Sequence, residues 1–312
     1  MAEADASETL RRSGRAPAGV VMVFLDGVGL GENDPERNPL AAARMPNFRD
    51  LIGGAPVAGT AARSEPGTVF RPIDARLGHE GLPQSATGQT SLLTGRNGAA
   101  IMGRHYGPWP GPTLIRELQE DTLFHHAAGS AALANAYPEG YFRALKGRRF
   151  RSNAPVTAAR AAGVTLFGLG AYRTGDALAA DVTGGAFRAI DATLPTLTPE
   201  EAGRRLARLA RRHAFTFFDL WVTDRLGHEQ RFADGVRLLE AIDGLLAGAL
   251  PGLGDATLVL TSDHGNLEDL GSRRHTQNRV PLLAVGPGAG AFDAADDLMD
   301  VALAGRELVL RA

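Results

Sequence analysis

Short, fully apolar segments alternate with amphipathic ones along this sequence, and the alternation leaves few folds open. In the clearest apolar segment, residues 20–25, every residue is apolar. A strand of this kind is buried on both faces, as in a parallel sheet that lies between two layers of helices. The alternation therefore predicts an α/β fold built from βα units around a largely parallel sheet.

The same patterns place the remaining elements. We predict further strands at 129–135, 215–222, 257–261 and 280–285. We predict helices at 45–52, 86–94, 114–119, 198–213 and 236–250. The fourth of these helices has a clear start, with Thr198 as its cap, Pro199 in the first position and Glu201 three residues after the cap.

Two stretches lack this regularity. Residues 1–16 read as a disordered tail. Residues 138–197 have weak periodicity and many Arg and Gly, which we interpret as a small cap inserted into one core domain of residues 17–312. The first residues include several acidic ones, and the only apolar run near the start is the short segment formed by residues 20–25. We therefore expect no signal peptide, no membrane contact and a cytoplasmic protein.

Composition restricts the chemistry. The chain of 312 residues has 33 basic against 35 acidic residues, which excludes a nucleic-acid protein held by overall charge. It contains no cysteine, which excludes thiolate nucleophiles, disulfide scaffolds and cysteine-based zinc sites. Any metal must be bound by carboxylates, hydroxyl groups or the 8 histidines.

Three predicted strands lead into an aspartate: Asp26, Asp224 and Asp263. Ligands of open α/β sheets bind outside the carboxyl ends of the strands, so these three carboxylates are expected to converge on one crevice. A single aspartate after a strand is more often a turn or cap residue. Three of them, two with a histidine close behind in the sequence, favour a functional site.

The histidines of interest are His228, His264 and His275. Together with the three aspartates they offer nitrogen and oxygen ligands for two divalent ions, with Zn²⁺ or Mn²⁺ favoured over Mg²⁺. Gly227 and Gly265 would let the loops fold around an ion. The other histidines are expected to be structural or surface residues: His79, His105, His125, His126 and His213.

Ser85 is the candidate nucleophile, because it lies where a loop becomes a helix. A helix N-terminus favours an anion, and a bound cation can activate a hydroxyl group that is otherwise a poor nucleophile. The competing interpretation is a helix cap. Competing motifs are absent: the sequence has no Gly-x-Ser-x-Gly and no Walker A motif, and residues 27–31 do not match the dinucleotide-binding Gly-x-Gly-x-x-Gly.

These residues resemble the alkaline phosphatase superfamily, and within it the branch of cofactor-independent phosphoglycerate mutase and phosphopentomutase. The similar segments span about 19–103 and 198–290. The resemblance implies a three-layer α/β/α sandwich. It also implies one metal ion bound by Asp26, Ser85, Asp263 and His264, and a second bound by Asp224, His228 and His275. Ser85 would be the residue that becomes phosphorylated.

Two departures from that branch favour hydrolysis of phosphate monoesters over mutase chemistry. The mutases have Gly-His where this chain has Gly88-Gln89. Their cap is also larger, and a mutase must hold its intermediate with several fixed cations. The arginines that could contribute are Arg143, Arg148, Arg149, Arg151 and Arg173.

We therefore expect a phosphatase that acts on a small phosphorylated substrate. Phosphomutase, phosphodiesterase and non-catalytic metal-binding relative remain the alternatives. The sequence leaves the oligomeric state and the identity of the substrate open.

Overall fold

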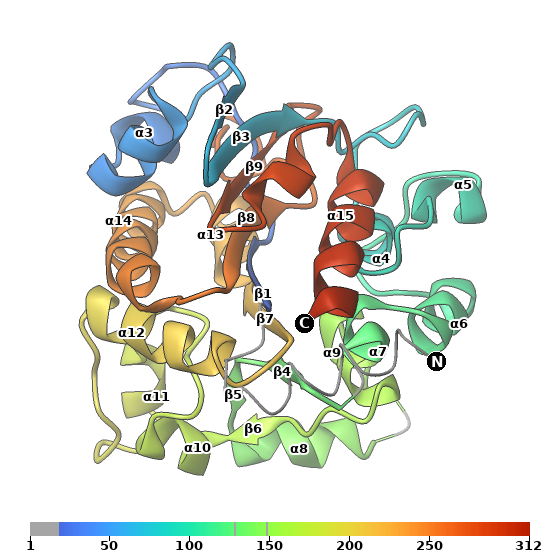
Figure 1. Ribbon diagram of the computed structural model, residues 1–312, viewed down its shortest axis with the longest axis vertical. Helices are drawn as coiled ribbons and strands as arrows, with labels where there is room; N and C mark the ends of the chain where they lie inside the picture. The colour runs from blue at the N-terminus through green and yellow to red at the C-terminus, as the bar shows by residue number, and fades with distance from the viewer. Residues whose placement is uncertain (1–18, 128, 148) are drawn as a thin grey trace, which may run out of the picture.

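The computed structural model describes residues 19–127, 129–147 and 149–312, so the expected tail at 1–16 and Arg148 lie outside the described residues. A seven-stranded sheet forms the centre (Figure 1). In order across the sheet its strands are β2 (Arg63–Glu65), β3 (Thr68–Ile73), β9 (Val280–Val285), β8 (Thr257–Ser262), β1 (Val20–Leu25), β7 (Phe215–Leu220) and β4 (Ala131–Leu133).

The sheet is mostly parallel, as predicted. Strand β1 pairs in parallel with β8 on one side and β7 on the other, and β4 pairs in parallel with β7. The β8–β9, β9–β3 and β3–β2 pairs are antiparallel, so every strand except β9 and β2 runs in one direction. The carboxyl ends of β1, β7 and β8 consequently lie side by side at one edge.

Helices cover both faces of the sheet, which confirms the three-layer α/β/α fold (Figure 1). One face packs against α3 (Pro46–Ile52), α10 (Leu169–Thr174), α11 (Gly185–Arg188), α12 (Pro199–Ala210) and α14 (Phe232–Ala249). The other packs against α4 (Ser85–Thr94), α6 (Pro112–Glu120), α7 (Leu123–His126), α9 (Ala154–Ala161) and α15 (Leu298–Arg311). Within the described ranges, the remaining helices are α2 (Pro39–Ala42), α5 (Gly98–Met102), α8 (Glu139–Leu145), α13 (Val222–His228) and two 3₁₀ turns, Leu250–Gly252 and Ala289–Phe292.

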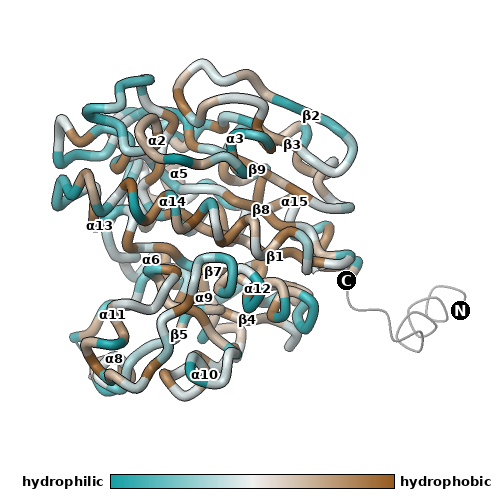
Figure 2. Tube along the Cα trace, turned by 90° about the vertical axis from the view of Figure 1, so that its left-hand side faces the viewer, coloured by the Kyte–Doolittle hydropathy of each residue, from teal (hydrophilic) through white to brown (hydrophobic). Residues whose placement is uncertain are grey.

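The all-apolar composition of β1 follows from its position between these layers. Val21, Val23 and Leu25 contribute to the core on one side of the sheet. Met22 and Phe24 contribute to the core on the other side. Hydrophobic residues accordingly gather along β1, β8 and β9 in the middle of the molecule (Figure 2). Because successive side chains of a strand point to opposite faces, a strand buried on both faces needs an apolar residue at every position.

One predicted helix start is confirmed, and one predicted strand end is wrong. The capping box of α12 forms as predicted, with Thr198 Oγ1 accepting from the Glu201 backbone and Glu201 accepting from that of Thr198. The predicted strand 215–222 is wrong at its end, because β7 stops at Leu220 and the chain turns directly into α13. Its apolar continuation, Trp221 and Val222, suits a helix start as well as a strand, which periodicity cannot resolve over so few residues.

The segment 138–197 contains α8 to α11 and one strand of a small parallel pair, β5 (Ala136–Tyr137) with β6 (Phe167–Gly168). Tyr172 and Phe187 join the core beneath α12 and α14, whereas Val156 joins the core on the opposite face. The segment is therefore anchored on both sides of the sheet. Its interpretation as a small cap inserted into one core domain stays a prediction.

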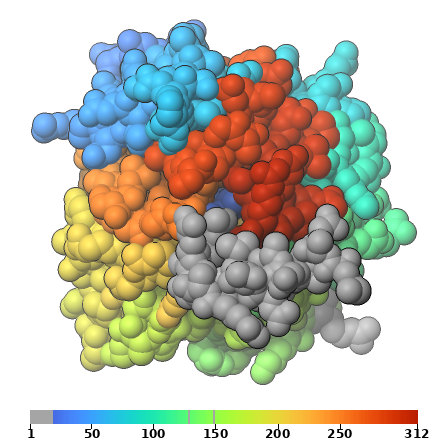
Figure 3. Space-filling view, in the orientation of Figure 1, coloured from blue at the N-terminus to red at the C-terminus, as the bar shows by residue number. Residues whose placement is uncertain are grey.

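Segments from the first quarter of the chain, coloured blue, and from its C-terminal part, coloured red, lie next to each other on the face shown in Figure 3. Arg71 of β3 donates from Nη2 to Asp296 at 2.9 Å and from Nε to the Ala295 carbonyl at 2.7 Å. Among the described residues, no helix combines the length and the hydropathy that crossing a bilayer would require.

Candidate metal centre and nucleophile

Neighbouring strands bring Asp26 and Asp263 together. Leu25 and Ser262, the last residues of β1 and β8, are register partners, so the aspartates that follow them are adjacent at the carboxyl edge of the sheet. Both side chains are buried, and the Gly27 backbone donates to Asp263 Oδ1 at 3.3 Å. Asp224 reaches the same place by another route, since it lies in the first turn of α13. The Thr223 hydroxyl, beside it, donates to the carbonyls of Asp26 and Leu220.

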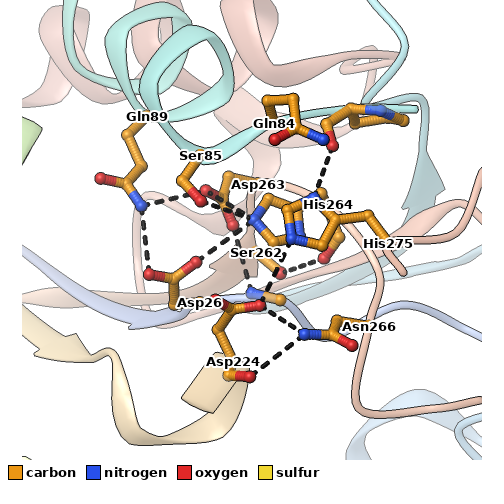
Figure 4. Close-up of polar contacts among 12 residues, drawn as sticks. Asp26, Gln84, Ser85, Gln89, Asp224, Ser262, Asp263, His264, Asn266 and His275 are labelled. Atoms are coloured by element: carbon orange, nitrogen blue, oxygen red, sulfur yellow. Dashed lines mark hydrogen bonds and ion pairs between the residues drawn. The ribbon is translucent and has the colours of Figure 1, made fainter. Parts of the chain in front are cut away.

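Ser85 is the first residue of α4, and the cap position belongs to Gln84, whose side chain makes no capping bond. The Ser85 hydroxyl is buried instead against His264, with Oγ and Nε2 3.0 Å apart (Figure 4). Gly88, one turn along, lets the helix approach closely, because a Cβ there would lie 2.9 Å from the Asp263 carbonyl oxygen. The structure thus disfavours the helix-cap interpretation of Ser85.

The first ligand cluster consists of Asp26, Asp263 and His264, whose candidate ligand atoms all lie within 4.8 Å of one another. Burial raises the pKa of both carboxyl groups well above the usual range, and the charge of a neighbouring carboxylate adds to the effect. Among the described residues, the buried Asp26 Oδ1 makes no hydrogen bond and has only the longer contact of 3.4 Å to His264 Nε2. Two buried carboxylates with an orphaned oxygen fit a divalent cation, which would supply the missing positive charge.

The second cluster consists of Asp224, His264 and His275. His228 completes it, with its Nε2 lying 3.3 Å from Asp224 Oδ2 and 3.2 Å from His275 Nε2. Although burial opposes ionisation of Asp224, hydrogen bonding to His228 and the charge of His264 lower its pKa below the usual range. Burial and the charge of His264 lower the pKa of His275 to about 4, so its ring is neutral at neutral pH.

The two facing imidazoles test whether this second cluster suits a cation. Nδ1 of His275 lies 2.7 Å from the Pro83 carbonyl, and Nδ1 of His228 lies 2.9 Å from that of Arg273. Because a carbonyl only accepts, each Nδ1 carries the hydrogen, so Nε2 is the atom of each ring that is left to bind a cation. Two Nε2 atoms that converge beside the Asp224 carboxylate fit a metal ion.

All seven predicted site residues therefore meet at one edge of the sheet. Two of the remaining histidines make other contacts. His126 pairs with Asp121 at 2.7 Å, and a ring nitrogen of His125 lies 2.8 Å from the Thr122 hydroxyl. Within the described ranges, the two clusters above are the only groups of three or more potential ligands.

Gln89 is a site residue that the sequence marked only as a departure from the mutases. Its Nε2 donates to Asp26 Oδ2 at 3.2 Å and to Asp263 Oδ2 at 3.1 Å, bridging the buried carboxylates (Figure 4). It lies one helical turn after Ser85, on the same face of α4. Its amide therefore orients the two aspartates from the side of the nucleophile.

Glu268 is a second residue that sequence reasoning missed. Its buried carboxylate accepts from the backbone of Gly29 at 2.9 Å and of Asn266 at 2.8 Å, from Asn278 Nδ2 at 3.0 Å and from the Thr276 hydroxyl. These donors come from the loop after β1 and from the loop that carries the histidines. Glu268 therefore clamps the two loops that present the ligands.

This clamp also explains the glycines at 27–31, which match no nucleotide-binding motif. A Cβ on Gly29 would lie 2.3 Å from Glu268 Oε1, and one on Gly31 would lie 2.7 Å from Glu268 Cγ. Asn266 adds a further support, because its Nδ2 donates to Asp224 Oδ1 at 2.6 Å. The glycine spacing at 27–31 is the sequence signal for this close packing. It does not identify Glu268 or Asn266, because both lie far away in the sequence.

The chain belongs to the metalloenzyme superfamily, whose family model matches residues 18–305. Its fold is similar to that of the alkaline phosphatase from the Antarctic bacterium TAB5, with 14% identity and a TM-score of 0.53 over 95% of this chain and 98% of that one. It is also similar to a protein of Pyrococcus horikoshii, with 13% identity and a TM-score of 0.57 over 96% of this chain and 98% of that one. At such identities the likeness shows the fold.

Two curated relatives share parts of the sequence. Both are 2,3-bisphosphoglycerate-independent phosphoglycerate mutases. The one from Halobacterium salinarum is 37% identical over 89 residues, which is 25% of this chain and 18% of that protein. The one from Pyrobaculum arsenaticum is 32% identical over 96 residues, which is 31% of this chain and 23% of that protein. The matches thus span about a fifth of these relatives' length. Together with the family match, they confirm the predicted resemblance.

Proposed function

We propose that this protein is a metal-dependent phosphoryl-transfer enzyme that hydrolyses phosphate monoesters through a phosphoserine at Ser85. One observation carries the proposal. The Ser85 hydroxyl lies at the start of α4, 3.0 Å from His264 and beside two clusters of carboxylates and imidazoles. A buried serine that served only the fold would not require so many carboxylate and imidazole groups around it.

The residues divide into two sets of ligands. Asp26, Ser85, Asp263 and His264 would hold one ion. Asp224, His228 and His275 would hold the other, with His264 next to both. When bound, divalent ions neutralise phosphate charge and lower the pKa of a coordinated hydroxyl or water. Zn²⁺ and Mn²⁺ suit this mixture of imidazole and carboxylate ligands.

The chain itself positions the reaction. The Ser85 oxygen forms a bond to phosphorus and gives up its proton while the bond to the ester oxygen breaks. The departing alkoxide takes up a proton, so an alcohol leaves with no net gain or loss of protons. The positive end of α4 favours the phosphoryl group next to Ser85. Water then attacks the phosphoserine, which releases inorganic phosphate and restores the hydroxyl. Gln89 and Asn266 keep the aspartates in place throughout.

Replacing the nucleophile tests the covalent step. Ser85→Ala should abolish phosphate release and the acid-stable labelling of the protein by a ³²P-monoester, while the variant still binds Mn²⁺ or Zn²⁺. Ser64→Ala, an exposed serine of β2, serves as the matched control and should behave as the wild type. Full activity of Ser85→Ala would refute the phosphoserine.

A phosphomutase is the second candidate, favoured by the partial identity to the phosphoglycerate mutases. A mutase needs several fixed cations around its substrate. Of the arginines predicted for that role, Arg173 is paired with Asp191 at 2.7 Å, whereas Arg151 faces the cavity next to Ser85. Quantifying free phosphate against isomerised 3-phosphoglycerate decides the matter, because a mutase releases little phosphate. A monoester and a diester compared side by side separate a phosphodiesterase.

A further inference from the structure

A cavity of about 760 Å³ opens beside the nucleophile. Asp26, Ser85, Gln89 and Asp224 line one end of it, so a substrate whose phosphate contacts Ser85 must extend its ester group into the rest. This volume lies in the range of sites that enclose a drug-sized ligand. A three-carbon hydroxy acid would leave most of it unfilled.

Six of the residues that line this cavity are Phe, Tyr or Trp. The rings of Tyr137 and Tyr141 stack with their centroids 4.4 Å apart, and the ring of Phe150 meets Tyr141 edge-on at 5.3 Å. Trp109 and Trp221 line the same cavity, although 42% and 39% of their surfaces remain exposed. Together with Phe150 they are the exposed large aromatic residues of the described chain. Exposed apolar rings gathered around one cavity are typical of a ligand-binding groove.

The charges in the cavity beyond the metal ligands balance. Arg151 and Arg225 bring two positive charges, and Asp181 and Glu229 bring two negative ones. The Arg225 guanidinium lies 5.3 Å from the ring centre of Trp221, where it extends the flat aromatic surface. A second anionic group on the substrate would require an excess of cations, which this wall does not offer.

We infer that the cavity binds the alcohol part of the substrate, and that this part is an uncharged aromatic group. The inference rests on the proposed phosphomonoester hydrolysis and specifies its substrate class: phosphate monoesters of alcohols that carry a planar ring. Stacking against the tyrosine and tryptophan rings provides affinity, while the phosphate remains with Ser85. Selectivity for such substrates lies in binding rather than in chemistry.

Two substrates with equally reactive ester bonds isolate this contribution. 2-(1-Naphthyl)ethyl phosphate and ethyl phosphate both release a primary alcohol, so their kcat values should be similar. Burial and stacking of the naphthyl ring should make its KM about 10- to 100-fold lower. Equal KM values, or an equally low KM for octyl phosphate, would overturn the aromatic specificity while leaving the hydrolysis itself in place.

A binding measurement decides the inference even if no monoester is hydrolysed. The chain has only 2 tryptophans, Trp109 and Trp221, and both line the cavity. A non-hydrolysable naphthylmethylphosphonate should therefore change the tryptophan fluorescence of the metal-loaded protein on saturation, whereas methylphosphonate should bind about 10- to 100-fold more weakly. Equal affinity for the two phosphonates, or no fluorescence change on saturation, would refute the aromatic site.

Variants locate the site. Trp109→Ala should raise the Kd of the naphthyl phosphonate at least about 3-fold and leave that of methylphosphonate unchanged, and Trp109→Phe should restore tight binding. Leu303→Ala removes a similarly exposed apolar side chain from α15, outside the cavity, and should have no effect. An equal loss for both phosphonates would show that Trp109 acts on the fold rather than on the ring.

Discussion

Asp219, the penultimate residue of β7, offers a quantitative test of the electrostatics. Only 1% of its surface is exposed, and its Oδ2 accepts a hydrogen bond from Asn153 at 2.8 Å. Burial raises its pKa from 3.8 to about 7, because desolvation of the carboxylate outweighs the hydrogen bond from Asn153. The folded protein therefore holds this group protonated at pH values where the unfolded chain has already released the proton.

The sign of the effect on stability follows by linkage. A raised pKa contributes stability that is fully present below the unfolded pKa, near 4, and is lost as the pH rises through the folded pKa. A shift of about three units corresponds to roughly 4 kcal/mol in the free energy of unfolding. Asp219→Asn exchanges no proton and keeps an oxygen for Asn153. The stability of the variant minus that of the wild type should thus increase by about 1.4 kcal/mol per pH unit from pH 4 to 7.

Urea unfolding monitored by circular dichroism at pH 4.5, 5.5, 6.5 and 8 measures this difference, at constant ionic strength and with EDTA present. Other titrating groups are common to both proteins and cancel in the subtraction. Ser64→Ala, which changes no titrating group at an exposed position of β2, is the control and should give a difference independent of pH. A flat profile for Asp219→Asn would refute the raised pKa.

Three further predictions concern the site. Glu268→Gln turns an NH₂ group towards two of the four donors that the Glu268 carboxylate accepts from, and should lower the free energy of unfolding by about 3 kcal/mol. An unchanged midpoint of urea unfolding would contradict the role of Glu268 in holding the two loops together. Gln89→Ala frees the carboxylates of Asp26 and Asp263 and should weaken Mn²⁺ binding about 10- to 100-fold by calorimetry, whereas an unchanged Kd would show that the bridge is dispensable. Chelation with EDTA should lower Tm by roughly 5 °C, and Mn²⁺ or Zn²⁺ should restore it, while Mg²⁺ should act more weakly. A Tm insensitive to chelation would speak against a structural contribution of the ions.

The sequence by itself determined the layers of the fold and the chemical types at the site. Apolar runs such as β1 and capping signals such as Thr198 are local, so they can be read within a few residues. The candidate ligands could be named for the same reason, because each predicted strand carries its aspartate close to its end. The turn from β7 into α13 was missed because its few apolar residues suit either structure.

Only the tertiary structure decided what supports and surrounds those ligands. Glu268 reaches Gly29 across 239 residues of sequence, and no local pattern connects them. Gln89 bridges Asp26 and Asp263 because α4 packs against the ends of β1 and β8. The aromatic cavity likewise collects rings, Tyr137 and Trp221 among them, from separate segments. Periodicity records which way a side chain faces within its own element, whereas contacts between elements depend on how the layers pack.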